Sequence, residues 1–200
     1  MFARVIGLLY TRIVLMHLAG DGKGREAMMV RGADVDWSGA HFEGADLRGW
    51  HFGEAQLQGA NFRGADLRRA NFASADARGA VFDDADCRAA DFSLALLHGA
   101  RFRRARLQNT CFEQAWLLSA HLEYAEVAET IFTSANLEWA WVEGVDFSRA
   151  EVWCAIFLNV RGLSGPTRQT LEAHGGFTGA RAMILGRELY ERGDESSDGS

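Results

Sequence analysis

The chain has 200 residues, 48% of them hydrophobic, which is enough apolar material for one folded domain and excludes a wholly disordered chain. Its formal net charge of −6 argues against a general nucleic-acid binder, because phosphate contacts need a surplus of Lys and Arg. The spacing of Cys87, Cys111 and Cys154 matches no zinc, iron–sulfur or disulfide framework, so we interpret them as reduced thiols of a cytoplasmic protein.

The first predicted element is an apolar helix over residues 2–18, followed by a glycine-rich loop at residues 20–24. Arg4 and Arg12 interrupt the apolar stretch, so it contains no run of about 18 uncharged apolar residues, the length that a membrane span needs. No small-residue cleavage site follows it, which argues against a secretory signal. The stretch favours an interfacial or capping helix, and we assign residues 1–34 to an N-terminal cap.

Residues 35–160 repeat with a period of five. Counted in steps of five from Phe42 to Phe157, every position is apolar, and the residue two places earlier is almost always Ala. This period fits neither an α-helix nor a long strand, so the chain must turn a corner once per repeat. An alanine-rich helical bundle would need apolar residues at i, i+3, i+4 and i+7. In extended backbone, residues two apart share a face, so the small and the large apolar residue both face a common core.

Three segments carry a resemblance to a known family. Ala-Asp-Leu-Arg-Gly at 45–49, Ala-Asn-Phe-Arg-Gly at 60–64 and Ala-Asp-Leu-Arg-Arg at 65–69 resemble the A(D/N)LXX consensus of the pentapeptide-repeat family. In that family, four pentapeptides form one square coil. The resemblance therefore implies an all-β solenoid, namely a right-handed quadrilateral parallel β-helix of about six coils. Because a solenoid exposes its core at both ends, we also expect short α-helical caps at the N- and C-terminal ends.

The phenylalanines of the repeats are predicted to be structural. If each coil takes twenty residues, they form two stacks on opposite faces, with leucines on the two faces between. One stack contains Phe42, Phe62, Phe82 and Phe102, and the other contains Phe52, Phe72, Phe92, Phe112 and Phe132. Each buried ring is expected to contribute roughly 1.5–3 kcal/mol.

The sequence after the repeats predicts helices. Ser-Gly-Pro at residues 164–166 is typical of a helix start, and Gly175 and Gly176 predict its end. A second helix is expected over residues 178–192, where Ala182, Leu185 and Leu189 share one face that would cover a coil end or pair with a second copy.

We divide the C-terminal part into two segments. Residues 161–192 are assigned to a C-terminal cap or dimerisation segment, and residues 193–200 to a disordered tail.

No enzyme chemistry is indicated by the sequence. The six histidines are scattered, and no Ser/His/Asp or Cys/His set and no pair of carboxylates in an obvious cleft can be assembled. The loop at residues 20–24 lacks the spacing of a phosphate-binding loop. We therefore predict a protein that is not an enzyme and has no catalytic residue, cofactor or metal.

The predicted outer surface has unequal halves. Three aspartates twenty residues apart each have an arginine two positions further on, which indicates a self-neutralised surface: Asp46, Asp66 and Asp86 with Arg48, Arg68 and Arg88. Residues 61–110 carry a net charge of +3, from nine Arg and six Asp. Residues 111–160 carry −7, from eight acids and one Arg, and also hold outward-facing tryptophans.

Exposed tryptophan beside acid is typical of an interface, so we place partner binding in this half. The candidate partner-binding residues are Glu123, Glu126, Glu129, Glu138, Glu143, Asp146, Trp139 and Trp141.

The resemblance also implies a function. Quinolone- and gyrase-inhibitor-resistance members of the family resemble B-DNA, dimerise through the C-terminal end, and bind type II topoisomerase in place of DNA. It thus implies a DNA mimic and homodimer that binds DNA gyrase or topoisomerase IV, protects it from fluoroquinolones or related antibiotics, and contacts no nucleic acid itself. This sequence departs from those members in its uninterrupted repeats and in a central arginine cluster, formed by Arg101, Arg103, Arg104 and Arg106.

Two alternatives remain open. One is a general protein-interaction scaffold with an unknown partner, and the other is a membrane-associated module anchored by residues 2–18. A continuous negative stripe would favour DNA mimicry, whereas a patchwork of charge would favour the scaffold.

Overall fold

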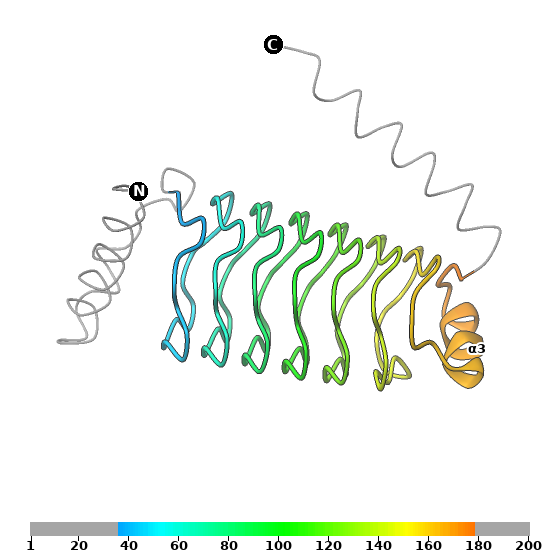
Figure 1. Cartoon of the computed structure of the whole chain (residues 1–200). Helices are drawn as coiled ribbons and strands as arrows, with labels where there is room; N and C mark the ends of the chain where they lie inside the picture. The colour runs from blue at the N-terminus through cyan, green and yellow to red at the C-terminus, as the bar shows by residue number, and fades with distance from the viewer. Residues whose placement is uncertain (1–35, 179–200) are drawn as a thin grey trace, which may run out of the picture.

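The computed structural model describes residues 36–178, which form a stack of coils followed by a short helix (Figure 1). Parallel bridges join nearly every strand position to the one twenty residues later, as in His41 to Asn61 and Asp46 to Asp66. With four five-residue repeats per coil, this register makes a quadrilateral parallel β-helix. The predicted N-terminal cap, the second C-terminal helix after Thr178 and the tail lie outside the described residues.

Each repeat has the same local structure. The central apolar residue donates its N–H to the next coil, as from Phe42 N to Asn61 O at 2.7 Å, and a turn follows, closed by Ala45 N to Phe42 O at 3.1 Å. The corner residue two places after the centre takes a left-handed conformation, as at Gly44 with φ 65°. Glycine adopts this conformation without steric cost, which explains the glycines at the corners of the first coils.

We name the four sides of the coil after the first apolar residue on each: the Phe42, Leu47, Phe52 and Leu57 sides. Side chains immediately before and after each central residue point outward on that side. Every outward position therefore belongs to a column of residues twenty apart.

The core confirms the predicted phenylalanine stacks. Rings within a stack lie face to face, with centroids 4.8 Å apart for Phe42 and Phe62 and 4.6 Å apart for Phe72 and Phe92. Rings of opposite stacks meet edge to face, as for Phe62 and Phe72 at 5.5 Å and 89°. All nine predicted core phenylalanines are at most 1% exposed. Both contact geometries are favourable for aromatic pairs, so the core has a repeated packing unit.

Two of the non-alanine small positions are explained by hydrogen bonds. The buried hydroxyl of Thr110 donates to the carbonyl of Cys87 at 2.8 Å, and that of Thr130 donates to Leu107 at 2.6 Å. Burial raises the pKa of the Cys87 thiol, so this cysteine is an inert part of the core. Within the described coils the bridge between Glu126 and Asp146 is missing, in the repeat where Val145 replaces Ala.

Helix α3, Gly165–Ala173, begins where the sequence predicts. The side chain of Ser164 accepts a hydrogen bond from the backbone N–H of Thr167 at 3.2 Å, and the helix ends before Gly175. Its Leu171 is fully buried against the core. The chain then adds one further bridge to the stack, between Phe177 and Ile156, which sequence analysis did not predict.

Candidate functional site

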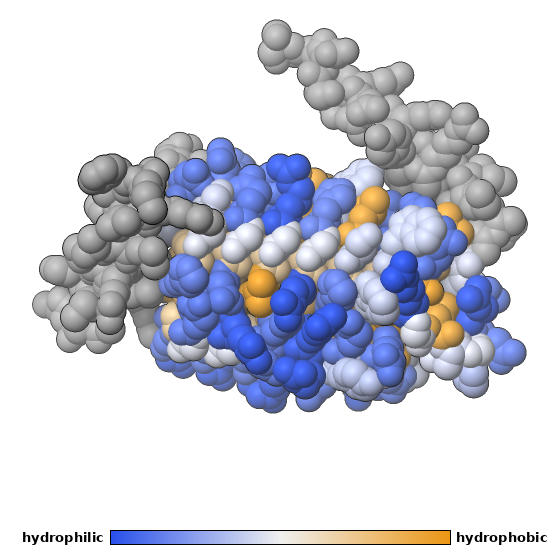
Figure 2. Space-filling view, in the orientation of Figure 1, coloured by the Kyte–Doolittle hydropathy of each residue, from blue (hydrophilic) through white to orange (hydrophobic). Residues whose placement is uncertain are grey.

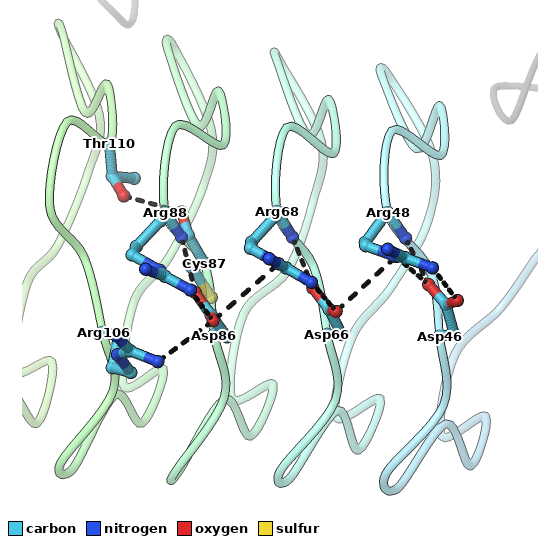
Figure 3. A network of polar contacts seen from close by, with 9 residues as sticks. All are labelled: Asp46, Arg48, Asp66, Arg68, Asp86, Cys87, Arg88, Arg106 and Thr110. Carbon is cyan, nitrogen blue, oxygen red and sulfur yellow. Dashed lines mark hydrogen bonds and ion pairs between the residues drawn. The ribbon is translucent and has the colours of Figure 1, made fainter.

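The Leu47 side carries the predicted ladder of aspartates and arginines. Each aspartate accepts two hydrogen bonds from the arginine two positions on, at 2.6–2.8 Å, in the pairs Asp46–Arg48, Asp66–Arg68 and Asp86–Arg88 (Figure 3). Successive coils are linked as well, by Arg48 Nε at 3.6 Å from Asp66. The hydrogen bonds from Arg68 lower the pKa of Asp66. The prediction of a self-neutralised surface is thus confirmed for these coils.

The central arginine cluster is also paired. Each arginine contacts an acid of the preceding or the following coil: Arg101 with Asp83, Arg103 with Glu123 at 3.0 Å, Arg104 with Asp84 at 2.7 Å, and Arg106 with Asp86 at 3.4 Å. Asp83 is only 2% exposed and also accepts a hydrogen bond from the backbone N–H of Arg103. The net positive charge of this segment is therefore distributed among ion pairs and does not form a free basic patch.

Glu123 and Glu129, two of the predicted partner-binding acids, are themselves paired. Glu123 is only 9% exposed and contacts Arg103 and His121 at 3.0 and 3.1 Å. Burial raises the pKa of Glu123, but its hydrogen bonds outweigh this effect and the pKa lies below the usual value. Glu129 is exposed and pairs with Arg149 at 2.6 Å. Of the two, Glu123 offers little of its carboxylate to a partner.

The other acids of this half have no ion-pair partner among the described residues. They are Glu113, Glu126, Glu138, Glu143, Asp146 and Glu151. Their columns place them on all four sides of the coil. Glu126 and Asp146 lie on the Leu47 side, Glu113 and Glu151 on the Phe52 side, Glu138 on the Leu57 side and Glu143 on the Phe42 side. The acids make a collar around the C-terminal coils, not a single stripe.

The two predicted tryptophans lie near one corner. Trp139, 48% exposed, occupies the left-handed corner between the Leu57 and Phe42 sides, with φ 62°. Trp141 follows on the Phe42 side, stacked on His121 at 5.7 Å and covered by the Arg161 guanidinium at 4.5 Å. Glu138, Trp139, Trp141 and Glu143 thus form one continuous run around the corner, whereas Glu126, Glu129 and Asp146 lie elsewhere on the coil.

Sequence analysis missed a set of apolar side chains on the Leu57 side. Six residues form what we call the apolar strip: Leu94, Leu96, Trp116, Leu118, Trp139 and Leu158. All six are at least partly exposed. The signal was available in the sequence. When residues twenty apart are aligned in columns, Leu96 stacks on Trp116 in the next coil, and Leu118 lies in the same column as Leu158, two coils away. Figure 2 shows a mostly hydrophilic face on which apolar side chains are more frequent over the C-terminal coils.

Sites of other kinds are not found in residues 36–178. No group of three or more His, Cys, Asp or Glu side chains there could hold a metal ion. In the same part of the chain no helix is long and apolar enough to cross a membrane, since α3 has nine residues.

Stacked parallel coils with a filled core and an outward-facing polar surface define a β-helical solenoid. The family model for pentapeptide repeats matches eight copies in this chain, over residues 51–86, 80–117 and 119–149. The chain belongs to the pentapeptide-repeat family, as the sequence resemblance implied, and this membership supports the expected quadrilateral β-helix. No curated protein matches the chain.

Several solved structures are similar to it. A pentapeptide repeat protein from the Arabidopsis thaliana thylakoid lumen is 28% identical, with a TM-score of 0.42, over 72% of this chain and 91% of that one. QnrB1, a plasmid-mediated fluoroquinolone resistance protein, is 16% identical, with a TM-score of 0.49, over 74% of this chain and 87% of that one. HetL of the cyanobacterium Nostoc, involved in heterocyst differentiation regulation, is 24% identical, with a TM-score of 0.38, over 65% of this chain and 70% of that one. These similarities do not distinguish between the candidate functions.

Proposed function

We propose that this protein is a non-enzymatic cytoplasmic binding protein whose C-terminal coils bind a basic surface of a protein partner. Type II topoisomerase, meaning DNA gyrase or topoisomerase IV, is the partner to test first. In this proposal the protein occupies the basic DNA-binding groove in place of DNA and protects the enzyme from inhibitors such as fluoroquinolones.

The observation that carries the proposal is the uneven pairing of acids along the rod. Among the described residues up to 110, six of ten acids pair with arginine, namely Asp46, Asp66, Asp76, Asp83, Asp84 and Asp86. Between residues 111 and 160, only Glu123 and Glu129 of eight acids do so. The C-terminal coils therefore keep negative charge that the N-terminal coils neutralise.

Such charge favours a basic partner for a physical reason. Exposed charges of one sign set up a potential that speeds the approach of an oppositely charged surface and disfavours partners of like charge. The run from Glu138 to Glu143 adds aromatic area beside these charges, and aromatic side chains contribute strongly to protein interfaces. Homodimerisation through the C-terminal end, also implied by the resemblance, would join two such collars into a longer acidic surface.

A general interaction scaffold is the second candidate, and the placement of the acids favours it. The collar surrounds the coil on four sides instead of forming a stripe, and the aspartates of the Leu47 side are neutralised up to Asp86. DNA presents its phosphates in continuous rows, so a patchwork is a poorer mimic. As a scaffold, the protein would bind with the same coils, but to a basic surface of a different partner protein.

The test is a gyrase supercoiling assay with a fluoroquinolone, together with direct binding measurements. The test variant carries Lys at Glu126, Glu138, Glu143 and Asp146, all exposed or partly exposed. The proposal predicts that the wild-type protein preserves supercoiling activity in the presence of the drug, and that this variant binds gyrase much more weakly.

The matched control exchanges a neutralised pair, Asp46→Arg with Arg48→Asp, and should bind gyrase like the wild type. Binding of other basic proteins but not of gyrase or topoisomerase IV would support the scaffold. Equal losses of gyrase binding in both variants would contradict the placement of the interface in the C-terminal coils.

A further inference from the structure

The apolar strip on the Leu57 side is a surface that the folded core does not require. The core beneath it is complete, with Leu97, Leu117 and Leu137 fully buried. The strip lies outside this layer, and at its corners Leu94 is 52% and Trp139 is 48% exposed. Asn136 and Glu138 interrupt the strip in one coil. Apolar side chains gathered outside a filled core gain stability from contact with another surface.

The N-terminal coils show what the same side looks like when it faces water. There the corresponding columns are polar and joined by hydrogen bonds. Ser38 Oγ donates to Gln58 Oε1 at 2.6 Å, Gln58 Nε2 donates to Asp76 at 2.6 Å, and Arg78 donates to Asp76 at 2.8 Å. The backbone is the same in both halves, so the change to leucine and tryptophan at most of these positions from Leu96 onward does not follow from the fold. His98, Asn136 and Glu138 are the polar exceptions.

Trp139 strengthens this contrast because of its position. The equivalent corners of earlier coils are small residues, all with positive φ: Gly39, Gly59, Gly79, Gly99 and Ser119. Trp139 takes the same left-handed conformation with φ 62°, which is sterically unfavourable for a bulky side chain. Many other corners take this conformation too, but a large and half-exposed tryptophan where earlier coils carry Gly or Ser indicates a contact role outside the coil.

The described chain ends on this side of the rod. After α3, Phe177 bridges Ile156 on the Leu57 side, donating to Ala155 O and accepting from Phe157 N at 2.8 Å each. Thr178, the last described residue, is 6% exposed. The next residue therefore emerges beside Leu158, at the end of the apolar strip.

The segment that follows has the length and the sequence to cover the strip. A helix over residues 179–192 would be about 21 Å long at about 1.5 Å per residue. The strip extends over three coil steps, from the coil of Leu96 to that of Leu158, about 14 Å at about 4.8 Å per step. On such a helix Ala182, Leu185 and Leu189 share one face and Ile184 lies on the opposite face. The segment also carries Arg181, Arg187 and Arg192 against two glutamates, a small positive excess that suits the acids around the strip.

We propose that residues 179–192 dock on the apolar strip of the same chain, with Leu185 and Leu189 on the leucines of the strip and close to Trp139. Attachment directly after Thr178 gives the segment a high effective concentration at the strip, which favours its own chain over a second copy. This proposal goes beyond the proposed function and does not depend on it.

The first experiment measures oxidation of individual tryptophans by hydroxyl radicals and mass spectrometry in the full-length chain. Trp153, 65% exposed on the Phe52 side, is the internal reference. We expect Trp139 to be oxidised several-fold more slowly than Trp153 in the wild type. Leu185→Asp with Leu189→Asp should raise the Trp139 rate several-fold and leave Trp153 unchanged, whereas Ile184→Asp should change neither rate. An unchanged Trp139 rate in the double variant would overturn the proposal.

The second experiment approaches the contact from the strip. In the full-length variant Leu118→Ser with Leu158→Ser, we expect faster tryptic cleavage after Arg181 and Arg187, and a circular dichroism spectrum like that of the wild type. The same cleavage rate as in the wild type would overturn the proposal.

Repeating both experiments at several protein concentrations distinguishes docking within one chain from docking on a second copy. Protection that rises with protein concentration together with a dimeric mass would assign the contact to a second copy and overturn docking in the same chain. Protection that is independent of concentration supports it.

Discussion

Residue by residue, the repeat has two demanding positions, the central apolar residue and the left-handed corner. The central phenylalanines are fully enclosed. Phe72, for example, stacks on Phe52 and Phe92 and meets the rings of Phe62 and Phe82 edge to face. The corner accepts other residues than glycine at a conformational cost of roughly 1–2 kcal/mol. That cost is tolerated at many corners along the rod, including Arg104, Tyr124 and Trp139, because the buried core provides most of the stability.

Truncation of a central ring should therefore be severe. We expect Phe92→Ala to lower the free energy of unfolding by about 3–5 kcal/mol, as large-to-small changes at buried aromatics do. The ring is 0% exposed and stacks at 4.6 Å on Phe72 and 5.1 Å on Phe112, so the cavity cannot collapse without moving both neighbours. Urea denaturation measures the change, with Leu94→Ala as an exposed control. A loss below about 1 kcal/mol would contradict the packing described here.

Among structural elements, the Leu47 side shows how the columns organise charge. Bidentate pairs within a repeat are extended by weaker contacts between coils, at 3.6 Å for Arg48 with Asp66 and 3.9 Å for Arg68 with Asp86. Burial raises the pKa of Asp86, but the hydrogen bonds from Arg88 outweigh it, so this pKa also falls below the usual value. The pairs are partly exposed, and exposed pairs contribute at most ~1 kcal/mol each, so their main effect is to orient the surface.

The ladder should make stability depend on acid. A carboxyl group whose pKa is lower in the folded than in the unfolded protein stabilises the fold above the unfolded pKa. This stability is lost as the pH falls through the folded pKa, because the unfolded chain binds protons first. The hydrogen bonds of Arg68 are the main cause for Asp66. We therefore expect Arg68→Met to reduce the stability that is lost on acidification from neutral pH to about pH 3, a loss that begins near the ordinary aspartate pKa of about 3.9.

Urea denaturation as a function of pH measures this slope. The control is Arg69→Met, because Arg69 has no ion pair among the described residues. An identical pH slope for both variants would show that the Asp66 pair does not determine the acid response.

How far the sequence predicts these elements depends on the range of the interactions. The five-residue period predicts the corners, the two phenylalanine stacks and the Asp66–Arg68 type of pair, because each depends only on neighbours in the repeat or on the column. Arg101 with Asp83 was not predicted, since this pair runs diagonally between coils and depends on side-chain conformations. The burial of Glu123 was missed because it also depends on side-chain conformations. The return of Phe177 to the stack was missed because this bridge forms after α3, beyond the five-residue period. The apolar strip could have been found by reading columns for hydrophobicity as well as for charge.

At the scale of the whole molecule, a solenoid is held together by contacts between adjacent coils, so its stability is local along the rod. The last described coil has two weak points, because the bridge from Glu126 to Asp146 is absent and no further full coil is stacked on it within residues 36–178. Leu171 of α3 compensates by packing on the core, and the Phe177 bridge holds the far side of the same coil. The end of the rod therefore depends on α3 more than the central coils do.

We expect Leu171→Ala to loosen the last coil selectively. Leu171 is 0% exposed, and loss of a buried leucine costs about 2–5 kcal/mol, a value that should act on the coil in contact with it. Amide hydrogen exchange measured by mass spectrometry should become faster over residues 150–161 and stay unchanged over residues 61–120, because unfolding of an end coil need not open the centre. The matched control is Phe82→Ala, a core truncation in a central coil, which should accelerate exchange over the central coils instead. If Leu171→Ala accelerated exchange equally along residues 61–161, the rod would unfold as one cooperative unit and α3 would stabilise all of its coils.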